Sequence, residues 1–417
     1  MALMIGMFKT CLAAAMLLLA WAEAGSAASF SARRGVSLDL WITWPPEQRW
    51  SEPDAILPYP EWGKFLKAAD LEALRAAGLD FVRMPVDPVP FLSGQSAHLV
   101  EDLFDSVRDS ARMVNAAGLK VVVDMHIVPA GGGRSIGTQQ ILDDPALFDR
   151  YLDVVRRMAR TLAGEDPALV ALELMNEPTS GCEGAEAGIW ADRLKRLFAA
   201  ARASATRLTL VLTGACWSSA EGLAALDPKD FPDDNLMWGF HSYDPFLLTH
   251  QGATWAGDFI RYVTGIPYPP SSAPRAELEA AVAKVKNTID AEAPWSRRAG
   301  MKAYLDELVS AIDTPEKLSA IMEKPFATVD AWAKKHGVGS EDILFGEFGM
   351  IRQEYRGPYV VPAAQRAAYY RDMIGHAEKH GYAWSMWSYG GAFGVVEEFD
   401  RRPAESDVLD VVRSLPD

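Results

Sequence analysis

LKVVVDMH at residues 119–126 is a nearly continuous apolar run that ends in polar side chains, and ILFGEFG at residues 343–349 repeats the pattern. Strands that are buried on both faces have this composition, because helices cover both sides of a parallel sheet. The two stretches therefore predict a parallel sheet whose strands end in polar groups.

Similar runs recur along the chain, and helical patterns lie between them. The expected strands are Arg34–Asp39, Leu79–Met84, Leu119–His126, Leu169–Met175, Leu208–Thr213, Leu236–His241, Ile343–Gly346 and Tyr382–Trp387. The expected helices are Ala68–Ala77, Ser106–Ala117, Pro145–Leu162, Ala185–Thr206, Thr314–Lys335, Ala364–His380 and Glu405–Ser414. Gly78 and Gly118 stand where a left-handed residue would end a helix. Eight β/α units favour an α/β fold of the closed (β/α)8 barrel type over an open doubly wound sheet.

The length of 417 residues is enough for two average domains or for one large barrel. A long segment at about residues 245–310 is poor in strand signals, and long loops in compact domains are usually functional or disordered. We expect an enlarged loop there, with a helix over Arg275–Ala291. Because no Ser/Thr/Pro-rich linker leads to a separate module, one barrel domain over residues 29–417 is the expectation.

The N-terminal segment has the pattern of a secretory signal peptide. Residues 10–22 carry no charge, follow Lys9 and precede the small residues 24–28. Such a run reaches about 20 Å as a helix, which is short of the roughly 30 Å bilayer core. We expect a signal peptide over residues 1–28, cleaved near Ala27 or Ala28, and an exported protein, periplasmic or extracellular, outside the membrane. An uncleaved membrane anchor is the alternative.

Export would remove Cys11 and would leave Cys182 and Cys216 in an oxidising compartment. A disulfide between these two residues and a pair of buried free thiols both remain open.

The charge balance limits the class of partner. Lys plus Arg number 41 and Asp plus Glu number 56, which gives a formal net charge of −15. Such a chain is a poor general binder of nucleic acid or of an anionic membrane surface. A neutral partner is therefore expected, and we expect a monomer.

Polar or aromatic groups follow six of the expected strands, at the level where barrel enzymes place their sites. These groups are Arg83, His126, Asn176 with Glu177, His241 with Tyr243, Glu347, and Trp387. Two of them are glutamates, and glycoside hydrolysis needs one carboxylic acid for the leaving oxygen and one carboxylate for the anomeric carbon. Pro178 disfavours a helical backbone at Glu177 and predicts an extended one.

Asn176-Glu177-Pro178 and Gly346-Glu347-Phe348-Gly349 resemble the catalytic segments of glycoside hydrolase family 5, the large cellulase family of retaining (β/α)8 enzymes. The resemblance places the acid/base at Glu177, on strand four, and the nucleophile at Glu347, on strand seven. The remaining invariant positions of the family fall on Arg83, His126, Asn176, His241, Tyr243 and Trp387.

The resemblance, together with the chemistry, implies a role for each residue. Glu177 should have a raised pKa, and Glu347 should stay ionised beside Arg83, with Tyr243 as a second donor. Asn176 would bind the sugar 2-hydroxyl. The remaining implied roles are hydroxyl binding or orientation of the glutamates for His126 and His241, and the floor of the sugar site for Trp387. No cofactor is implied, and the histidines form no common metal-binding spacing.

The expected partner is a neutral β-linked polysaccharide or oligosaccharide, and the expected activity is that of an endo-β-1,4-glucanase. A β-mannanase, another β-glucanase, an exopolysaccharide-processing hydrolase and a non-catalytic glycan-binding barrel are the alternatives, and transfer to sugar rather than water stays open. Trp41, Trp44, Trp217 and Trp255 follow strand ends and are candidate platforms for sugar rings. For Trp255, and for the neighbouring residues 250–252, a plain surface loop is the competing interpretation.

Overall fold

The computed structural model describes residues 30–39, 47–52, 66–131, 133–354, 357–398 and 402–416. The expected signal peptide, Trp41 and Trp44 lie outside these residues. The strands are β1 (Arg34–Ser37), β2 (Phe81–Val86), β3 (Lys120–Met125), β4 (Val170–Glu173), β5 (Thr209–Thr213), β6 (Leu236–His241), β7 (Ile343–Phe348) and β8 (Ala383–Met386). They form a closed barrel in sequence order, and every neighbouring pair, including β1 with β8, is parallel. The predicted (β/α)8 barrel is confirmed.

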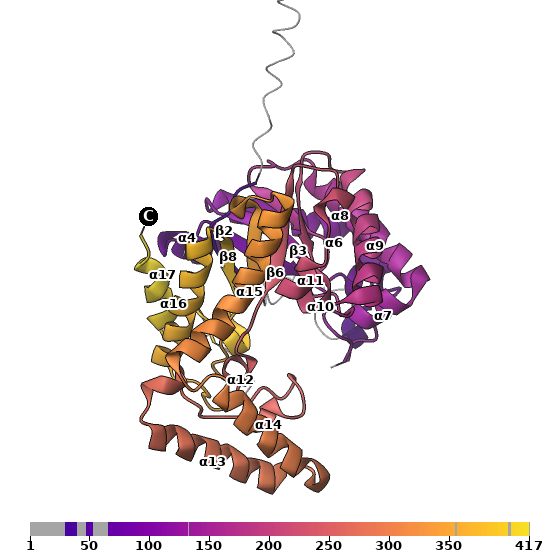
Figure 1. Cartoon of the computed structure of the whole chain (residues 1–417). Helices are drawn as coiled ribbons and strands as arrows, with labels where there is room; N and C mark the ends of the chain where they lie inside the picture. The colour runs from indigo at the N-terminus through magenta and orange to yellow at the C-terminus, as the bar shows by residue number, and fades with distance from the viewer. Residues whose placement is uncertain are drawn as a thin grey trace, which may run out of the picture.

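Helices surround the barrel on its outer side (Figure 1). The main helices that follow β1, β2, β3, β4, β6, β7 and β8 are, in that order, α4 (Ala68–Ala76), α6 (Val100–Ala116), α8 (Pro145–Leu162), α9 (Gly184–Arg202), α15 (Pro315–His336), α16 (Ala363–His380) and α17 (Asp407–Arg413). Gly78 and Gly118 have φ values of 98° and 81°, so both adopt the left-handed conformation expected after a helix end. None of the helices in the described part of the chain has the length and apolarity that crossing a bilayer requires.

One helix start differs from the prediction by more than two residues. The helix expected over Ser106–Ala117 begins six residues earlier, at Val100. Glu101 and Asp102 lie in its first turn, where negative charge is favourable beside the helix N-terminus. Leu103, Phe104 and Val107 of this helix are buried, so its first turns also pack on the core.

The strand residues divide between two apolar layers. Val121 and Val123 face the surrounding helices, whereas Val122 faces the barrel interior. The interior layer consists of Phe30, Phe81, Val122, Ala171, Val211, Met237, Leu344 and Ala383. One level nearer the C-terminal strand ends, the interior side chains become polar, beginning with Ser37 and Ser385, whose hydroxyls lie 3.2 Å apart. The apolar layer therefore closes the floor beneath a polar chamber.

Short helices lie in the segments that follow several of the strands. They are α5 (Val89–Leu92), α7 (Thr138–Asp143), α10 (Ala215–Ser218), α11 (Ala220–Ala224) and α12 (Phe246–Thr249). Short 3-10 turns lie at Glu47–Arg49, Ala97–Leu99, Pro228–Asp230, Ile260–Tyr262, Pro270–Ser272, Trp295–Arg297, Ser340–Asp342 and Gly391–Phe393.

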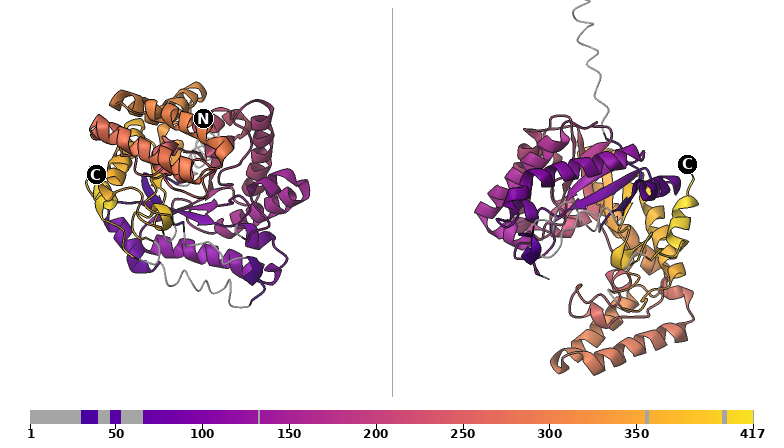
Figure 2. Two further views of the ribbon diagram at one scale, coloured as in Figure 1. Left: turned by 90° about the horizontal axis from the view of Figure 1, so that it is seen from below. Right: turned by 180° about the vertical axis from the view of Figure 1, so that it is seen from behind.

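The segment at residues 245–310 contains a two-helix hairpin rather than a loop with one helix. The expected helix is present as α13 (Arg275–Glu292), and a second one, α14 (Arg298–Ser310), was not predicted. Ion pairs join the two helices, from Lys286 to Asp306 (2.6 Å) and from Lys302 to Asp290 (2.7 Å). Figure 1 shows the hairpin beyond α12, on the side of the molecule where the strands end, and the right-hand view of Figure 2 shows it in orange on the same side.

Candidate active site

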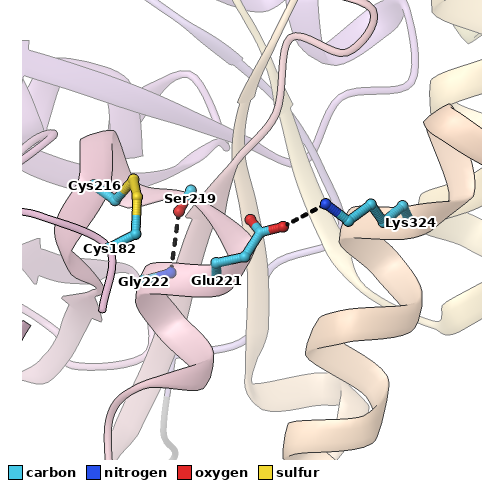
Figure 3. Close-up of a disulfide and its surroundings, with 6 residues drawn as sticks. All are labelled: Cys182, Cys216, Ser219, Glu221, Gly222 and Lys324. Carbon is cyan, nitrogen blue, oxygen red and sulfur yellow. Dashed lines mark hydrogen bonds and ion pairs between the residues drawn. A yellow bond between two sulfur atoms is a disulfide. The ribbon is translucent and has the colours of Figure 1, made fainter. Parts of the chain in front are cut away.

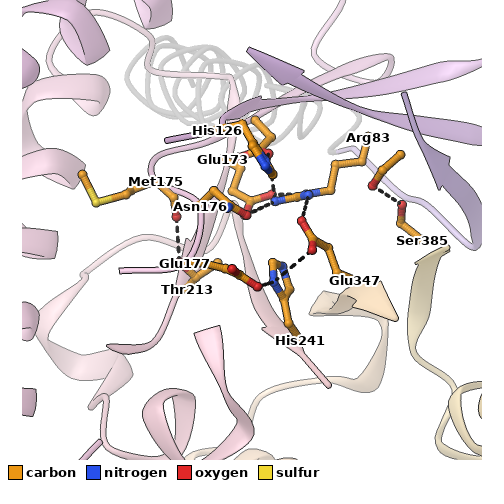
Figure 4. Close-up of polar contacts among 12 residues, drawn as sticks. Arg83, His126, Glu173, Met175, Asn176, Glu177, Thr213, His241, Glu347 and Ser385 are labelled. Atoms are coloured by element: carbon orange, nitrogen blue, oxygen red, sulfur yellow. Dashed lines mark hydrogen bonds and ion pairs between the residues drawn. The ribbon is translucent and has the colours of Figure 1, made fainter. Parts of the chain in front are cut away.

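Arg83 is the centre of the polar chamber. Its side chain projects inward from β2 and is fully buried. Nη1 donates to Glu347 Oε1 (2.5 Å), while Nε and Nη2 donate to the two oxygens of Glu173 (2.7 and 2.9 Å). Nη2 also donates to Asn176 Oδ1 (2.8 Å) and lies 2.9 Å from Asp124 Oδ2. One planar guanidinium therefore fixes groups from β3, β4 and β7, and Figure 4 shows Glu173, Asn176 and Glu347 around it.

Three buried carboxyl groups surround Arg83. Burial alone would lower the pKa of Arg83, but Asp124, Glu173 and Glu347 raise it well above its usual range. Burial raises the pKa of Glu173, and raises that of Asp124 to about 7, against the pull of the arginine. A buried charge left without its partner costs about 3–5 kcal/mol. Arg83 therefore stabilises the chamber as well as orienting its carboxylates.

Glu347 receives one donor on each carboxylate oxygen. Arg83 donates to Oε1, and the Tyr243 hydroxyl donates to Oε2 (2.9 Å). Burial and the nearby carboxylates raise the pKa of Tyr243, so its hydroxyl stays protonated and remains a donor. These are the two donors that the sequence analysis assigned to Glu347. The two donors hold the Glu347 carboxyl group in one orientation.

The strand ends at Glu347 are locally irregular. The pairing of β6 with β7 shifts register between Phe240 and His241, and His241 comes to lie opposite Glu347. Irregularities of this kind re-aim side chains next to active sites. Gly346 is needed here, because a Cβ atom at that position would lie 2.9 Å from His241 Nε2.

Glu177 lies after β4 and keeps part of its side chain exposed to the cleft. Burial raises its pKa to about 7, although His126 and Arg83 act in the opposite direction. His241 Nδ1 lies 3.0 Å from Glu177 Oε1 and 3.8 Å from Glu347 Oε2. Since burial lowers the pKa of His241 to about 4, this imidazole is neutral near pH 7. A neutral bridge of this kind can orient both carboxyl groups without adding charge.

The backbone at Glu177 corrects one expectation. The sequence predicted an extended conformation before Pro178, but Glu177 has a φ of 41°. Proline disfavours the right-handed helical region for the preceding residue, and a left-handed backbone also satisfies that restriction. A non-glycine residue in this region costs of order 1 kcal/mol or more, and such strain is found at functional sites.

The two glutamates face each other across a short gap. One carboxylate oxygen of Glu177, one of Glu347 and one ring nitrogen of His241 all lie within 4.8 Å of one another. Retaining glycosidases hold their two carboxyl groups about 5–5.5 Å apart, whereas inverting enzymes hold them about 6.5–9.5 Å apart. Three such atoms could also surround a cation, but the short distance between the two carboxylate oxygens is the one that the retaining class needs. The geometry fits proton transfer and displacement better.

His126 and Trp387 form the opposite wall. His126 Nδ1 lies 2.7 Å from Asp124 Oδ2, and its ring stacks on Trp387 with centroids 5.3 Å apart and planes inclined by 8°. Burial lowers the pKa of His126, so the stacked ring is neutral near pH 7. The ends of β3 and β8 are thereby joined beside the glutamates.

A family model described as cellulase (glycosyl hydrolase family 5) matches residues 49–393. The chain belongs to glycosyl hydrolase family 5. Endoglucanase C of Acetivibrio thermocellus is 23% identical to it over 383 residues, which cover 92% of this chain and 98% of the relative. Endoglucanase 3 of Fibrobacter succinogenes is 24% identical over 349 residues, covering 80% and 48% of the two chains. The protein is therefore a glycoside hydrolase, and the non-catalytic barrel is no longer a competing interpretation.

Solved structures show the same fold. The cellulose synthase subunit Z of Clostridioides difficile has a TM-score of 0.63 at 19% identity, covering 91% of this chain and 99% of the other. Thermotoga maritima Cel5A in complex with cellobiose has a TM-score of 0.61 at 18% identity, covering 91% and 97%.

The structure brings all eight motif residues of this family 5 enzyme to one chamber. The two outer tryptophans that it describes lie on the surface instead, with Trp217 48% and Trp255 58% exposed. The backbone N–H of Trp217 donates to the Pro178 carbonyl (3.0 Å), so this residue adjoins the Glu177 segment. Trp255 contacts the ring of His250. His250 itself is buried, so the surface-loop interpretation is wrong for that residue.

A disulfide joins Cys182 to Cys216, with their Cα atoms 4.7 Å apart (Figure 3). It links the segment after β4, which carries Glu177, to the segment after β5, which carries Trp217. Ser219 caps the neighbouring helix by accepting from the backbone N–H of Gly222 (3.0 Å). The family 5 site therefore has a covalent tie along the edge where Glu177 lies.

Sequence reasoning missed Asp124 and Glu173 as parts of the site. Both interrupt apolar runs at positions that face the barrel interior, in phase with Val122 and Ala171. A charged residue at an interior position of a parallel strand must have a partner, because an isolated buried charge is costly. The position of each acidic residue two places after an interior apolar residue could have predicted that both face the chamber. Arg83, which also faces the chamber, is their ion-pair partner.

Proposed function

We propose that this family 5 enzyme is an endo-β-1,4-glucanase that hydrolyses its substrate with retention of anomeric configuration. Glu177 serves as the acid/base and Glu347 as the nucleophile. The proposal rests chiefly on the separation of their carboxylate oxygens, which lie within 4.8 Å of each other.

The contacts support a two-step mechanism. In the first step, Glu177 gives its proton to the glycosidic oxygen while Glu347 attacks the anomeric carbon, and a glycosyl-enzyme forms as the leaving sugar departs. In the second step, Glu177 takes a proton from water, and the resulting oxygen nucleophile displaces Glu347. Arg83 and Tyr243 keep the Glu347 carboxylate fixed for attack in the first step. They donate to the same carboxylate again when it leaves the anomeric carbon in the second step.

The neighbouring groups fit the subsite around the reacting sugar. Arg83 fixes the Asn176 amide by donating to its oxygen, which suits contact of that amide with the sugar 2-hydroxyl. Trp387, stacked on His126, provides an apolar plane for a sugar ring. The chamber therefore combines an aromatic wall with polar groups of fixed orientation.

The substrate class is proposed from the relatives. Two of them are named endoglucanases, and Thermotoga maritima Cel5A has been solved with cellobiose and with mannotriose. A reducing-end assay over barley β-glucan, hydroxyethylcellulose, laminarin, xyloglucan and β-mannan tests the proposal. We expect the highest kcat/KM on hydroxyethylcellulose and barley β-glucan, which contain β-1,4-linked glucose. The viscosity of these solutions should fall rapidly as internal bonds break. Highest activity on mannan or laminarin would contradict it.

Export is proposed from the pattern of residues 1–28, and the disulfide supports it because such bonds persist in oxidising compartments. The same assay on cell fractions tests this proposal. Activity confined to the cytoplasm would contradict export.

The pH dependence follows from Glu177. The first step needs this carboxyl protonated, and burial raises its pKa to about 7. We therefore expect kcat/KM to fall by about tenfold per pH unit once the pH exceeds about 7. With Glu177→Gln and a 2,4-dinitrophenyl cellobioside, which needs no protonation to leave, this alkaline limb should disappear. Persistence of the same limb in the variant would assign it to another group.

A further inference from the structure

A cavity of about 560 Å³ lies between α12, residues 256–260 and α14, away from the two glutamates. Its wall includes Phe246 from α12 and Tyr304 from the hairpin helix α14. Figure 1 shows α12 between the barrel and this hairpin, on the side where the strands end. The cavity volume is within the range of about 300–1,000 Å³ that is usual for sites that bind small organic groups.

Two half-exposed aromatic rings line the cavity. Phe246 is 44% exposed and stacks on His250, with centroids 4.0 Å apart and planes inclined by 17°. Tyr304 is 49% exposed and contacts Phe259 edge-on, with centroids 5.1 Å apart. Each ring is held by a buried or half-buried neighbour while about half of its surface faces water. Rigid apolar surface of this kind, exposed beside polar groups, is typical of a binding site.

A stack of packed rings separates the cavity from the catalytic chamber. The His250 ring that supports Phe246 also contacts Tyr243, with centroids 5.0 Å apart. Tyr243 in turn donates to Glu347 (2.9 Å). The cavity and the chamber therefore lie on either side of His250 and Tyr243.

The charges at the rim favour a neutral ligand. Arg297 contributes the positive charge among the lining residues, and its Nη1 lies 2.5 Å from Asp258 Oδ2. Asp244 adds a further carboxyl, so acidic groups outnumber the paired cation. A polyanion would be repelled at this rim, whereas a polyhydroxyl chain could use the same carboxyls as hydrogen-bond acceptors.

We propose that this hairpin cavity is a remote glycan-binding site, which holds a segment of the neutral β-linked polymer away from the bond being cleaved. Phe246 and Tyr304 would contact the apolar faces of sugar rings, and Asp244 would accept from hydroxyls. The inference rests on the proposed function, and it adds a preference for long chains over short ones. Tyr304 and Phe246 are specificity-determining residues in this account, not catalytic ones.

The test compares Tyr304→Ala with Trp295→Ala, on barley β-glucan and on 4-nitrophenyl cellobioside. Trp295 is a matched control because it is 85% exposed, adjoins α14 and does not line the cavity. For Tyr304→Ala we expect KM on the polymer to rise by about tenfold, while kcat/KM on the short substrate stays within about twofold of the wild type. Tyr304→Phe should restore most of the polymer affinity.

A binding measurement keeps the test independent of turnover. The Glu347→Gln protein should be retarded in a native gel that contains β-glucan, and the added Tyr304→Ala substitution should reduce that retardation. Equal behaviour of Tyr304→Ala and Trp295→Ala on both substrates would overturn the inference alone. A wild-type protein that cleaves neither substrate would overturn the proposed function instead. A dimer that Tyr304→Ala dissociates would assign the cavity to a second copy of the chain and would also overturn the inference.

Discussion

Glu347→Ala lowers kcat on β-1,4-glucan by about 10⁴-fold or more and leaves the barrel folded. Without the carboxylate no glycosyl-enzyme can form, and single removals of a covalent nucleophile have effects of this order. The loss should not unfold the protein, because Arg83 retains its contacts with Asp124 and Glu173. Initial rates together with thermal unfolding of both proteins measure the two effects.

Two controls distinguish the loss of the nucleophile from a loss of structure in the active site. Glu341→Gln changes an exposed glutamate just before β7 and should leave kcat within about twofold. Azide added to Glu347→Ala should enter the vacated space and restore turnover of an activated β-glycoside, with an α-glycosyl azide as product. Retention of more than a tenth of wild-type turnover without azide would end the assignment of Glu347 as nucleophile.

Glu177→Gln lowers activity by an amount that depends on the leaving group. A natural glycosidic bond has a poorly acidic leaving group, so kcat/KM on β-glucan should fall by about 10³- to 10⁴-fold. A 2,4-dinitrophenyl glycoside leaves without protonation, so its first step should change little and the second step should become limiting. A burst of dinitrophenolate in pre-steady-state kinetics measures this difference.

Glu183→Gln is the matched control, since it changes an exposed glutamate in the segment that follows Glu177. It should not alter the rate on either substrate by more than about twofold. Azide added to the Glu177 variant should yield a β-glycosyl azide, because it attacks the glycosyl-enzyme from the face that Glu177 normally serves. An equal loss on the natural and the activated substrate would show that Glu177 is not the acid.

The barrel was predictable because its signals are local. Apolar runs, helix periodicity and the glycines at positions 78 and 118 identify strands and helices without knowledge of their neighbours. The second hairpin helix was not predicted, because its apolar positions Met301, Leu305 and Val309 are sparse and its pairing with α13 depends on ion pairs between the helices.

The motif residues of the site could be predicted from the sequence, but the buried residues that hold them in place could not. Glu177 and Glu347 stand in recognisable segments, but the partners of Arg83 come from three other strands, and no spacing in the sequence reports such contacts. The φ of Glu177 could not be inferred either, because proline excludes one backbone region and leaves two others open.

Trapping of the covalent intermediate tests the central claim most directly. The wild-type enzyme is incubated with 2,4-dinitrophenyl 2-deoxy-2-fluoro-β-cellobioside, digested, and mapped by mass spectrometry. The account predicts that the fluorinated disaccharide is attached to the peptide that contains Glu347, and that Glu347→Gln is not labelled. Attachment to Glu177 or to any other residue, or the release of a product with inverted configuration, would contradict it.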